Sequence, residues 1–321
     1  MEETNPPEGN AMARWKSITV ETRREAVDAV SHFFTTQGAL GMAYDEQLYG
    51  PDGDPADPLP PPDEVTHLTA YFPWDTDLAS LKGEFLEFLP VLDESFGPDC
   101  GSFVSASEIT DLGWAEKWKE HFRPQRIGPR ITVRPSWEPY QAGPDEVVLI
   151  IDPGQAFGTG THETTRMCLR LIERLFGSAS PPKRVLDFGT GTGILGIAAA
   201  RLGAEDTLGT DIDPKAVETA GENARINGVA DRFRAENIPL LSIRERFDLI
   251  VANILAEILV DLKREIAALS TPDGRLLLSG ILSEKGDWVL QEYATERFFP
   301  EERIEDGQWT ALLLRRAAGS G

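Results

Sequence analysis

The stretch Arg184–Asp213, RVLDFGTGTGILGIAAARLGAEDTLGTDID, carries the strongest fold signal in the chain. It predicts, in order, an apolar strand that ends at Asp187, a glycine-dense turn over 189–193, a helix of small residues over Ile194–Leu202 and a second strand that ends at Asp211. Such a strand–turn–helix–strand unit presents open backbone and one acidic side chain to a nucleoside ligand. The pattern therefore predicts an α/β domain that binds a nucleoside.

Two ligand classes fit this turn. Gly191, Gly193 and Gly196 match the G-x-G-x-x-G pattern of dinucleotide-binding proteins, and Asp211 lies where that pattern places a ribose-binding acid. S-adenosylmethionine (SAM) fits the same geometry, and two details favour it. Asp187 directly precedes the turn, where it could meet the ligand's ammonium group, and the denser G-x-G-x-G spacing leaves more bare backbone for a ligand. A structural alternative stays open, in which these glycines only pack a helix closely on a strand.

Length, composition and charge indicate a globular protein of two domains. The 321 residues exceed a typical single domain, 41% are hydrophobic and 26% are charged. The sequence has no apolar run of about 18 residues that would predict a membrane span, and its start, MEETNPPEGN, is unlike a signal peptide. Two cysteines, Cys100 and Cys168, make no disulfide framework, which favours a reducing cytoplasm.

The net charge of −22 is a second compositional signal. It predicts a surface that repels nucleic acid and anionic lipid and attracts a basic protein. An equal alternative is that the acidity serves only solubility.

The first part of the chain predicts a leader and a small α+β domain. Residues 1–13, rich in Pro, Glu and Asn, are expected to be disordered. Residues 14–108 follow the order β-α-β-β-α-β, which predicts a ferredoxin-like sandwich. The predicted strands are Trp15–Val20, Ala39–Tyr44, Val65–Phe72 and Phe103–Ile109, and the predicted helices are Arg23–Phe34 and Leu78–Leu89.

A linker over 109–126 separates this domain from the second one. Its segment Asp111–Phe122 predicts a helix, in which Trp114, Trp118 and Phe122 recur at i, i+4 and i+8. We expect this aromatic face to pack against a domain rather than to bind a ligand.

Residues 127–321 alternate between strands and helices, which predicts a parallel sheet covered on both faces. The predicted strands are Ile131–Val133, Val147–Ile151, Val185–Asp187, Thr207–Asp211, Phe247–Ala252, Arg275–Ser279 and Trp309–Leu314. Besides the helix after the glycine turn, the predicted helices are Arg166–Phe176, Pro214–Ile226 and Ala256–Ala268. Asp213 before Pro214 is typical of a helix start.

A second glycine-rich loop, DPGQAFGTGTHETT at Asp152–Thr165, precedes the parallel sheet. It lacks G-K-[ST] and so is not a phosphate-binding P-loop. We expect it to fold over the ligand and close the site. Its candidate contact residues are Phe157, Thr161, His162, Thr164 and Thr165. The alternative is that Thr164 or Thr165 only caps the following helix.

A third candidate segment is the apolar strand FDLIVANIL at Phe247–Leu255. Ligands of parallel α/β sheets bind at the carboxyl ends of the strands, so Asn253 should lie at the same edge as Gly189 and Asp211. Its side-chain amide could accept a hydrogen bond from a substrate amine. A turn-forming asparagine is the alternative.

Together these three segments resemble one family. PGQAFGTGTHETT, VLDFGTGTGILGIAA with GTDIDPKAVETAGENARINGV, and DLIVANILAEIL are similar to the bacterial ribosomal protein methyltransferase family called PrmA. The resemblance extends to WAEKWKEHFRPQRIG, VRPSW and LLLSGIL and covers about residues 110–315. The first domain resembles the family in its arrangement more than in its residues.

The resemblance implies a class I SAM-dependent methyltransferase domain behind a small substrate-recognition domain. The implied reaction methylates lysine amines of large-subunit ribosomal protein L11, with its N-terminal amine as a further acceptor. The implied SAM contacts are Thr165, Gly189, Asp211 and Asn253, beside the candidates Phe157, Thr161, Asp187 and Gly191. Asn253 is the candidate that orients the amine or the methionine end of SAM, and His162 is a candidate base.

The chain departs from the family pattern at a few positions. Thr190 and Thr192 replace a Cys and a Ser, Glu163 replaces a Pro, and a proline-rich loop covers 51–63. Three alternatives stay open: a methyltransferase that acts on another protein lysine or on a glutamine amide, an NAD-dependent oxidoreductase, and a non-catalytic SAM-binding module.

Overall fold

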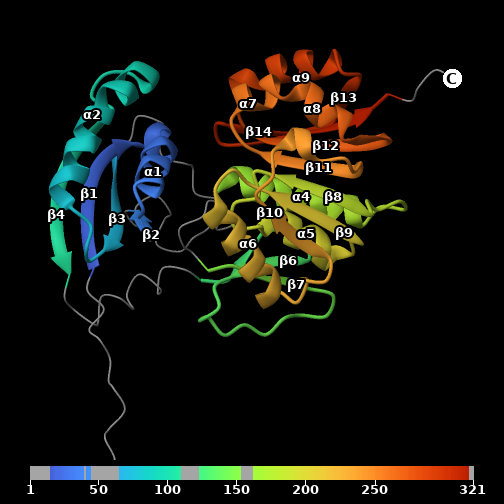
Figure 1. Cartoon of the computed structure of the whole chain (residues 1–321), viewed down its shortest axis with the longest axis horizontal. Coiled ribbons are helices and arrows are strands. Elements are labelled where there is room, and N and C mark those ends of the chain that lie inside the picture. Colours follow the sequence, from blue (N-terminus) through green and yellow to red (C-terminus); the bar gives the residue numbers. More distant parts are fainter. Residues whose placement is uncertain (1–14, 40, 45–64, 110–122, 153–161, 318–321) are drawn as a thin grey trace, which may run out of the picture. The chain divides into compact units, whose positions relative to one another are not determined.

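The computed structural model describes residues 15–39, 41–44, 65–109, 123–152 and 162–317 (Figure 1). The chain divides into two compact units, residues 1–122 and 123–321. The predicted leader (1–13), the predicted linking helix (111–122), the proline-rich loop and the candidates Phe157 and Thr161 lie outside the described residues.

The first unit is a four-stranded antiparallel sheet with two helices on one face (Figure 1). Its elements are β1 (Trp15–Arg23), η1 (Arg24–Ala26), α1 (Val27–Thr36), β2 (Gly41–Tyr44), β3 (Val65–Pro73), α2 (Leu78–Phe96) and β4 (Gly101–Ile109). The strand order β2-β3-β1-β4 and the β-α-β-β-α-β sequence confirm the predicted ferredoxin-like arrangement. Alternate residues of β1 and β3, such as Ile18, Val20 and Leu68, share one core with α1 and α2.

Helix α2 is longer than predicted. The expected helix ended at Leu89, before Pro90, but the observed helix continues to Phe96. Asp77 caps its start by accepting hydrogen bonds from the amides of Ala79 (2.9 Å) and Ser80 (3.3 Å). Phe85 and Leu92 are buried on either side of the proline, so tertiary packing stabilises the helix across it.

The second unit contains a seven-stranded sheet of order β10-β9-β8-β11-β12-β14-β13. Its strands are β8 (Arg184–Phe188), β9 (Asp206–Thr210), β10 (Phe233–Glu236), β11 (Phe247–Asn253), β12 (Ser270–Leu282), β13 (Phe298–Asp306) and β14 (Trp309–Arg316). Neighbours from β10 to β12 pair in parallel, whereas β14 is antiparallel to both β12 and β13. The reversed β14 distinguishes this sheet from the all-parallel order 3-2-1-4-5-6 of dinucleotide-binding domains.

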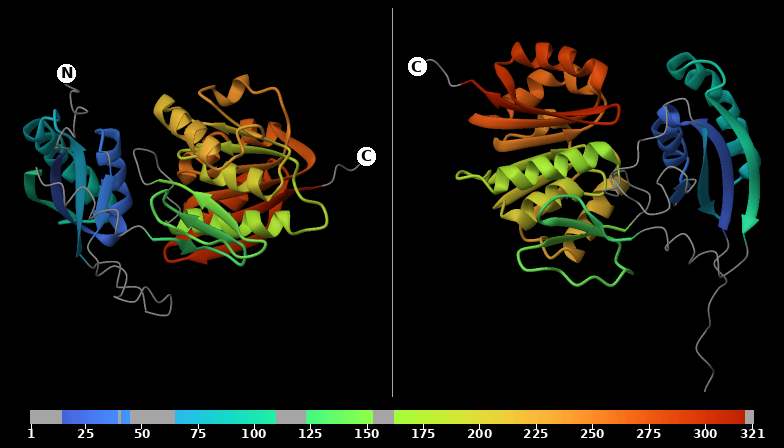
Figure 2. Two further views of the ribbon diagram at one scale, coloured as in Figure 1. Left: turned by 90° about the horizontal axis from the view of Figure 1, so that it is seen from below. Right: turned by 180° about the vertical axis from the view of Figure 1, so that it is seen from behind.

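Helices cover both faces of this sheet (Figure 2). They are α4 (Glu163–Phe176), α5 (Ile194–Leu202), α6 (Pro214–Ile226), α7 (Ala256–Asp261), α8 (Lys263–Ala268) and α9 (Gly286–Ala294), with η3 (Leu240–Ser242) and η4 (Ser283–Lys285). Residues of α4, α5 and α6 share one core with the sheet, and residues of α7, α8 and α9 share the other. The prediction of one helix over 256–268 was wrong, because the chain leaves the helical region at Leu262 (φ −99°, ψ 11°).

A three-stranded sheet begins the second unit. It consists of β5 (Gln125–Arg126), β6 (Ile131–Arg134) and β7 (Val147–Ile150), in the order β5-β6-β7. Ile131, Val133 and Leu149 join the core that contains α4 and α5. Both cysteines of the chain, Cys100 in the first unit and Cys168 on α4, are buried thiols outside any disulfide. No helix in the described part of the chain is long and apolar enough to span a membrane.

Candidate functional site

The carboxyl ends of three neighbouring parallel strands bring most of the predicted site residues to one edge of the large sheet. The glycine turn follows β8, Asp211 follows β9, and Asn253 is the last residue of β11. Because β9, β8 and β11 are adjacent in the sheet, residues far apart in the sequence meet there. The start of α4 reaches the same edge, where the Asn253 Nδ2 donates to the Thr165 Oγ1 (3.4 Å).

The glycine turn needs its glycines for two reasons. Gly189, Gly191 and Gly193 have φ angles of +73°, +53° and +83°, which side chains rarely tolerate. A Cβ at Gly189 would lie 2.7 Å from the Ile254 side chain, and one at Gly193 would lie 3.0 Å from Ala220. Backbone conformation therefore favours glycine at all three positions, and close packing excludes a side chain at Gly189 and Gly193 as well.

The acid after β9 organises the turn from the side. One carboxylate oxygen of Asp211, Oδ2, accepts from the Gly191 amide (2.9 Å), and Oδ1 accepts from the Asp213 amide (3.0 Å). Asn237, after β10, donates from Nδ2 to the carbonyl oxygens of Asp211 (2.7 Å) and Ile212 (3.0 Å). These four bonds fix the Asp211 carboxylate beside open backbone at the strand end.

Ile212 and Leu255 are functional candidates that the sequence prediction missed. Ile212 is 94% exposed beside the Asp211 carboxylate, and Leu255 is 60% exposed two residues after Asn253. A large apolar side chain next to a carboxylate suits a nucleoside, because a base can cover the apolar group while the ribose hydroxyls reach the acid. The available signal was an isoleucine between two aspartates directly after a strand, in GTDIDP.

Asp187 lies beneath the turn and is 1% exposed. Its Oδ2 accepts from the Thr190 Oγ1 (2.7 Å) and from the Gly196 amide (2.9 Å). Burial raises the pKa of Asp187 to about 7, against the lowering effect of these two hydrogen bonds, and the nearby Asp211 charge adds to the rise. The Thr190 hydroxyl thus donates a hydrogen bond to the buried Asp187 carboxyl group, which precedes the turn.

His162 is the N-cap of α4. Its Nδ1 accepts from the Thr164 amide (3.2 Å) and lies 2.7 Å from the Thr164 hydroxyl, while its ring packs edge-on against Trp309. The alternative that Thr164 or Thr165 caps this helix was therefore wrong: both are buried inside its first turn. As the candidate base, His162 has Nε2 at 3.7 Å from the Glu163 carboxylate.

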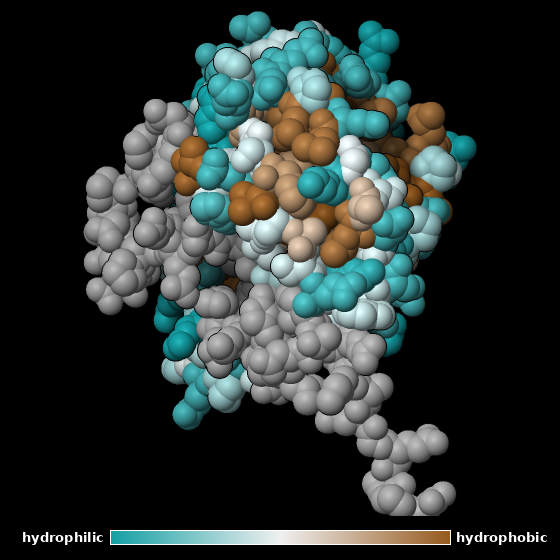
Figure 3. Space-filling model, turned by 90° about the vertical axis from the view of Figure 1, so that its left-hand side faces the viewer, coloured by the Kyte–Doolittle hydropathy of each residue, from teal (hydrophilic) through white to brown (hydrophobic). Residues whose placement is uncertain are grey.

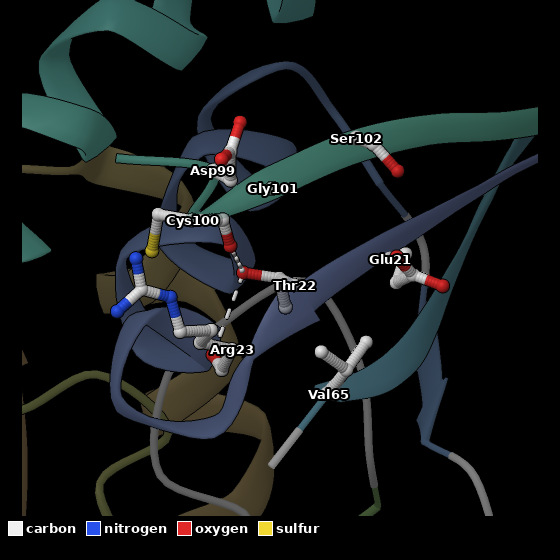
Figure 4. A pocket seen from close by; sticks show the side chains of 8 residues that line it. All are labelled: Glu21, Thr22, Arg23, Val65, Asp99, Cys100, Gly101 and Ser102. Carbon is white, nitrogen blue, oxygen red and sulfur yellow. Dashed lines mark hydrogen bonds between the residues drawn. The ribbon is translucent and has the colours of Figure 1, made fainter. Parts of the chain in front are cut away.

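The first unit contains a separate hollow of about 140 Å³ at one end of its sheet (Figure 4). Its lining includes Glu21, Arg23, Cys100 and Ser102. The Arg23 guanidinium donates to the Pro98 carbonyl. The side chains of Glu21 and Ser102 point away from Arg23 (Figure 4). The polar groups here do not converge on one point, unlike those at the carboxyl edge of the large sheet.

The carboxyl edge fits SAM. The exposed Ile212 beside a fixed carboxylate matches an adenosine, and the positive-φ turn with its buried acid matches an amino-acid tail that approaches bare backbone. A parallel sheet with a reversed β14 and this edge defines a class I SAM-dependent methyltransferase.

Comparison with known proteins identifies the family. The model of the family described as ribosomal protein L11 methyltransferase (PrmA) matches residues 14–317. The chain is 39% identical to the ribosomal protein L11 methyltransferase of Geobacter sulfurreducens, over 94% of this chain and 98% of that one. It is also 39% identical to that of Syntrophotalea carbinolica, over 95% and 99%. The protein belongs to the PrmA family.

A solved structure agrees with this assignment. The crystal structure of ribosomal protein L11 methylase from Lactobacillus delbrueckii subsp. bulgaricus is similar with a TM-score of 0.56 and 36% identity, over 61% of this chain and all of that chain. The predicted fold class and SAM as the cofactor are confirmed, and the oxidoreductase alternative is set aside.

Proposed function

We propose that this protein transfers methyl groups from SAM to lysine side-chain amines of ribosomal protein L11. The observation that carries the proposal is that the similarity to proteins named for this activity spans 94–95% of the chain and so includes the first unit. A generic SAM-binding domain would match only the second unit. The N-terminal amine of L11 is proposed as a further acceptor, and the cytoplasm as the site of action.

The residues that would hold SAM are Asp211 on the ribose, Ile212 on the base, and Gly189, Gly191, Thr165 and Asn253 on the remainder. The buried Asp187 carboxyl group would hold the glycine turn in place, because it accepts from the Thr190 hydroxyl and the Gly196 amide. SAM supplies a methyl group already activated by its sulfonium, so the protein contributes placement and electrostatics.

The acceptor lysine must lose its proton before it can attack. With an ordinary lysine pKa of 10.4, deprotonation at pH 7 costs roughly 4–5 kcal/mol. Exposed apolar residues at this edge, such as Leu255, would desolvate the amine and lower its pKa. Because the Asn253 NH₂ group points to Thr165, its carbonyl oxygen remains the acceptor that can orient an amine N–H.

The first unit is proposed to recognise the protein substrate. Its exposed apolar residues include Leu86 and Val91 on α2 and Val104 on β4, which are 45%, 53% and 47% exposed. Figure 3 shows apolar side chains spread among polar ones on one face of the molecule. Exposed apolar groups rimmed by polar ones suit a protein partner, and the net charge of −22 favours a basic one. Direct contact with nucleic acid is not part of the proposal.

Methyl transfer to L11 tests the proposal directly. Purified protein, SAM with a labelled methyl group and unmethylated ribosomal proteins should give label on L11 lysines, located by mass spectrometry. Label on another protein, with none on L11, would contradict the substrate assignment and leave the methyltransferase class intact.

Removal of residues 1–108 tests the role of the first unit. The second unit has its own hydrophobic cores, so the shortened protein should fold and bind SAM. It should lose methylation of L11. Full activity of the shortened protein would contradict substrate recognition by the first unit.

A further inference from the structure

Helix α6 contacts the glycine turn through its side. The helix starts at the N-cap Asp213, two residues after Asp211, and Ala220 packs against Gly193. Asn223, which is 5% exposed, donates from Nδ2 to the carbonyl oxygen of Thr192 (2.9 Å). The first half of the turn is held by the Thr210 carbonyl, which accepts from the Gly189 and Thr190 amides, whereas a side chain of α6 holds the second half.

The end of α6 contacts a different element, the strand β7. Asn227 is 3% exposed, and its side-chain amide bonds both backbone groups of Ile150. Its Oδ1 accepts from the Ile150 amide (2.8 Å), and its Nδ2 donates to the Ile150 carbonyl (2.7 Å). Since β6 pairs with the other side of β7, Asn227 acts there as a substitute for a neighbouring strand.

One asparagine is linked to the other. The Asn227 Nδ2 also donates to the backbone carbonyl of Asn223 (2.8 Å). Hydrogen bonds, joined covalently through Asn223, therefore link the end of β7 through α6 to the Thr192 carbonyl in the glycine turn. All of its side-chain members are buried, where loss of a bonding partner leaves a costly unpaired group.

We infer that Asn223 and Asn227 are positioning residues for SAM, through which α6 fixes the glycine turn and the end of β7 in one geometry. The inference rests on the proposed SAM-dependent function. A neutral amide suits both positions because each side chain faces a backbone carbonyl, to which it must donate. An aspartate of the same shape would face that carbonyl with a negative charge.

The test measures SAM affinity by calorimetry in the full-length protein, with no acceptor present. Asn223→Asp and Asn227→Asp should each weaken SAM binding by about tenfold, as expected for one buried hydrogen bond. Asn223→Ala and Asn227→Ala serve as the milder pair if the aspartates do not fold. The matched control is Tyr293→Phe, which removes a buried hydrogen bond to the Leu259 carbonyl (2.9 Å) away from the turn. It should lower Tm and leave SAM affinity unchanged.

A second measurement separates positioning from general destabilisation. Hydrogen exchange of the Ile150 amide should accelerate in Asn227→Ala and stay at the wild-type rate in Tyr293→Phe. Wild-type SAM affinity in the folded asparagine variants, or an equal loss of affinity in Tyr293→Phe, would overturn the inference. A wild-type protein that binds no SAM would instead overturn the proposed function itself.

Discussion

The amino ends and the carboxyl ends of the parallel strands in the seven-stranded sheet, here called its amino edge and its carboxyl edge, use their charged residues differently. At the amino edge, two arginines pair with two acids: Arg184 lies 3.5 Å from Asp206 and 3.8 Å from Glu245, and Arg234 bonds both acids. A third acid there, Asp248, accepts from the backbone amides of Lys183 and Arg184. At the carboxyl edge, Asp187 and Asp211 bind backbone amides and a hydroxyl instead of cations. Acids that pair with arginines are already neutralised, whereas the partly exposed Asp211 carboxylate, held by backbone amides, can still accept from ligand hydroxyl groups; Asp187 is buried beneath the turn.

Exposed apolar side chains reinforce this difference. Ile212 and Leu255 stand open at the carboxyl edge, whereas at the amino edge Phe247 is fully buried under the Arg184 guanidinium, 5.6 Å from its ring centroid. We therefore propose the carboxyl edge, which keeps a partly exposed acid and open apolar surface, as the edge that binds the nucleoside of SAM. The comparison is therefore testable by matched substitutions at the two edges.

The largest effect should come from Asp211→Ala. Loss of a charged partner for the ribose should weaken SAM binding roughly a hundredfold, which calorimetry would measure. Asp206→Ala at the amino edge is the control: it should lower Tm by a few degrees and leave SAM affinity unchanged. Equal loss of affinity in both variants would show that the two edges do not differ in SAM binding.

The pH dependence of stability should reveal the buried Asp187 carboxyl group. In the unfolded chain its carboxyl group ionises near pH 4, but in the folded protein its pKa is raised to about 7. The folded state therefore holds the extra proton, and the free energy of unfolding falls as pH rises from about 4 to about 7.

Asp187→Asn removes this titration. Relative to wild type, the variant should be about 2 kcal/mol more stable at pH 8 than at pH 5, measured by urea unfolding at both pH values. An Asp187→Asn difference that is the same at both pH values would show that the carboxyl group is already ionised in the folded protein at pH 5.

A smaller effect is expected at Asn253. Asn253→Ala removes the acceptor that we assign to the amine, so kcat should fall about tenfold. Asn253→Asp keeps an acceptor oxygen and should retain more activity than the alanine variant. If both variants transfer methyl groups at the wild-type rate while Asp211→Ala loses SAM binding, the edge binds the cofactor without orienting the amine.

The smallest effect is expected at Ile212. Ile212→Ser removes apolar surface that we expect the base to cover, so SAM affinity should fall severalfold, by about 1 kcal/mol. Because this side chain is 94% exposed, Tm should not change. Leu241→Ser, at another exposed residue (70%) on η3, is the control and should change neither quantity.

Local sequence signals predicted the centre of the second unit well. The bounds of α5 and α6 agree with prediction, because a glycine turn starts one helix and Asp213-Pro214 starts the other. Strands β10 and β13 were not predicted. The first has four residues, and the second, FFPEERIED, shows a mostly exposed, charged pattern that only its pairing with β14 explains.

The missed features of the site arise from contacts between distant segments. Histidine is not among the usual helix caps, so the start of α4 at His162 had no clear local signal. The packing of Ile254 against Gly189 joins residues that are 65 positions apart, and no local pattern reports it. The sequence identified the site residues, but it did not show which residues from distant segments pack against them.

The two outer strands of the large sheet also bear on how the protein behaves in a crowded solution. On one side the sheet ends with the four-residue β10, and on the other with β13, which carries Pro300, several charged residues and a register shift between Pro300 and Glu302. Short strands, prolines, charges and irregular pairing all obstruct the addition of a foreign strand. Both margins of the large sheet are thus protected against edge-to-edge aggregation, and contacts that other chains make there must form through side chains rather than through sheet extension.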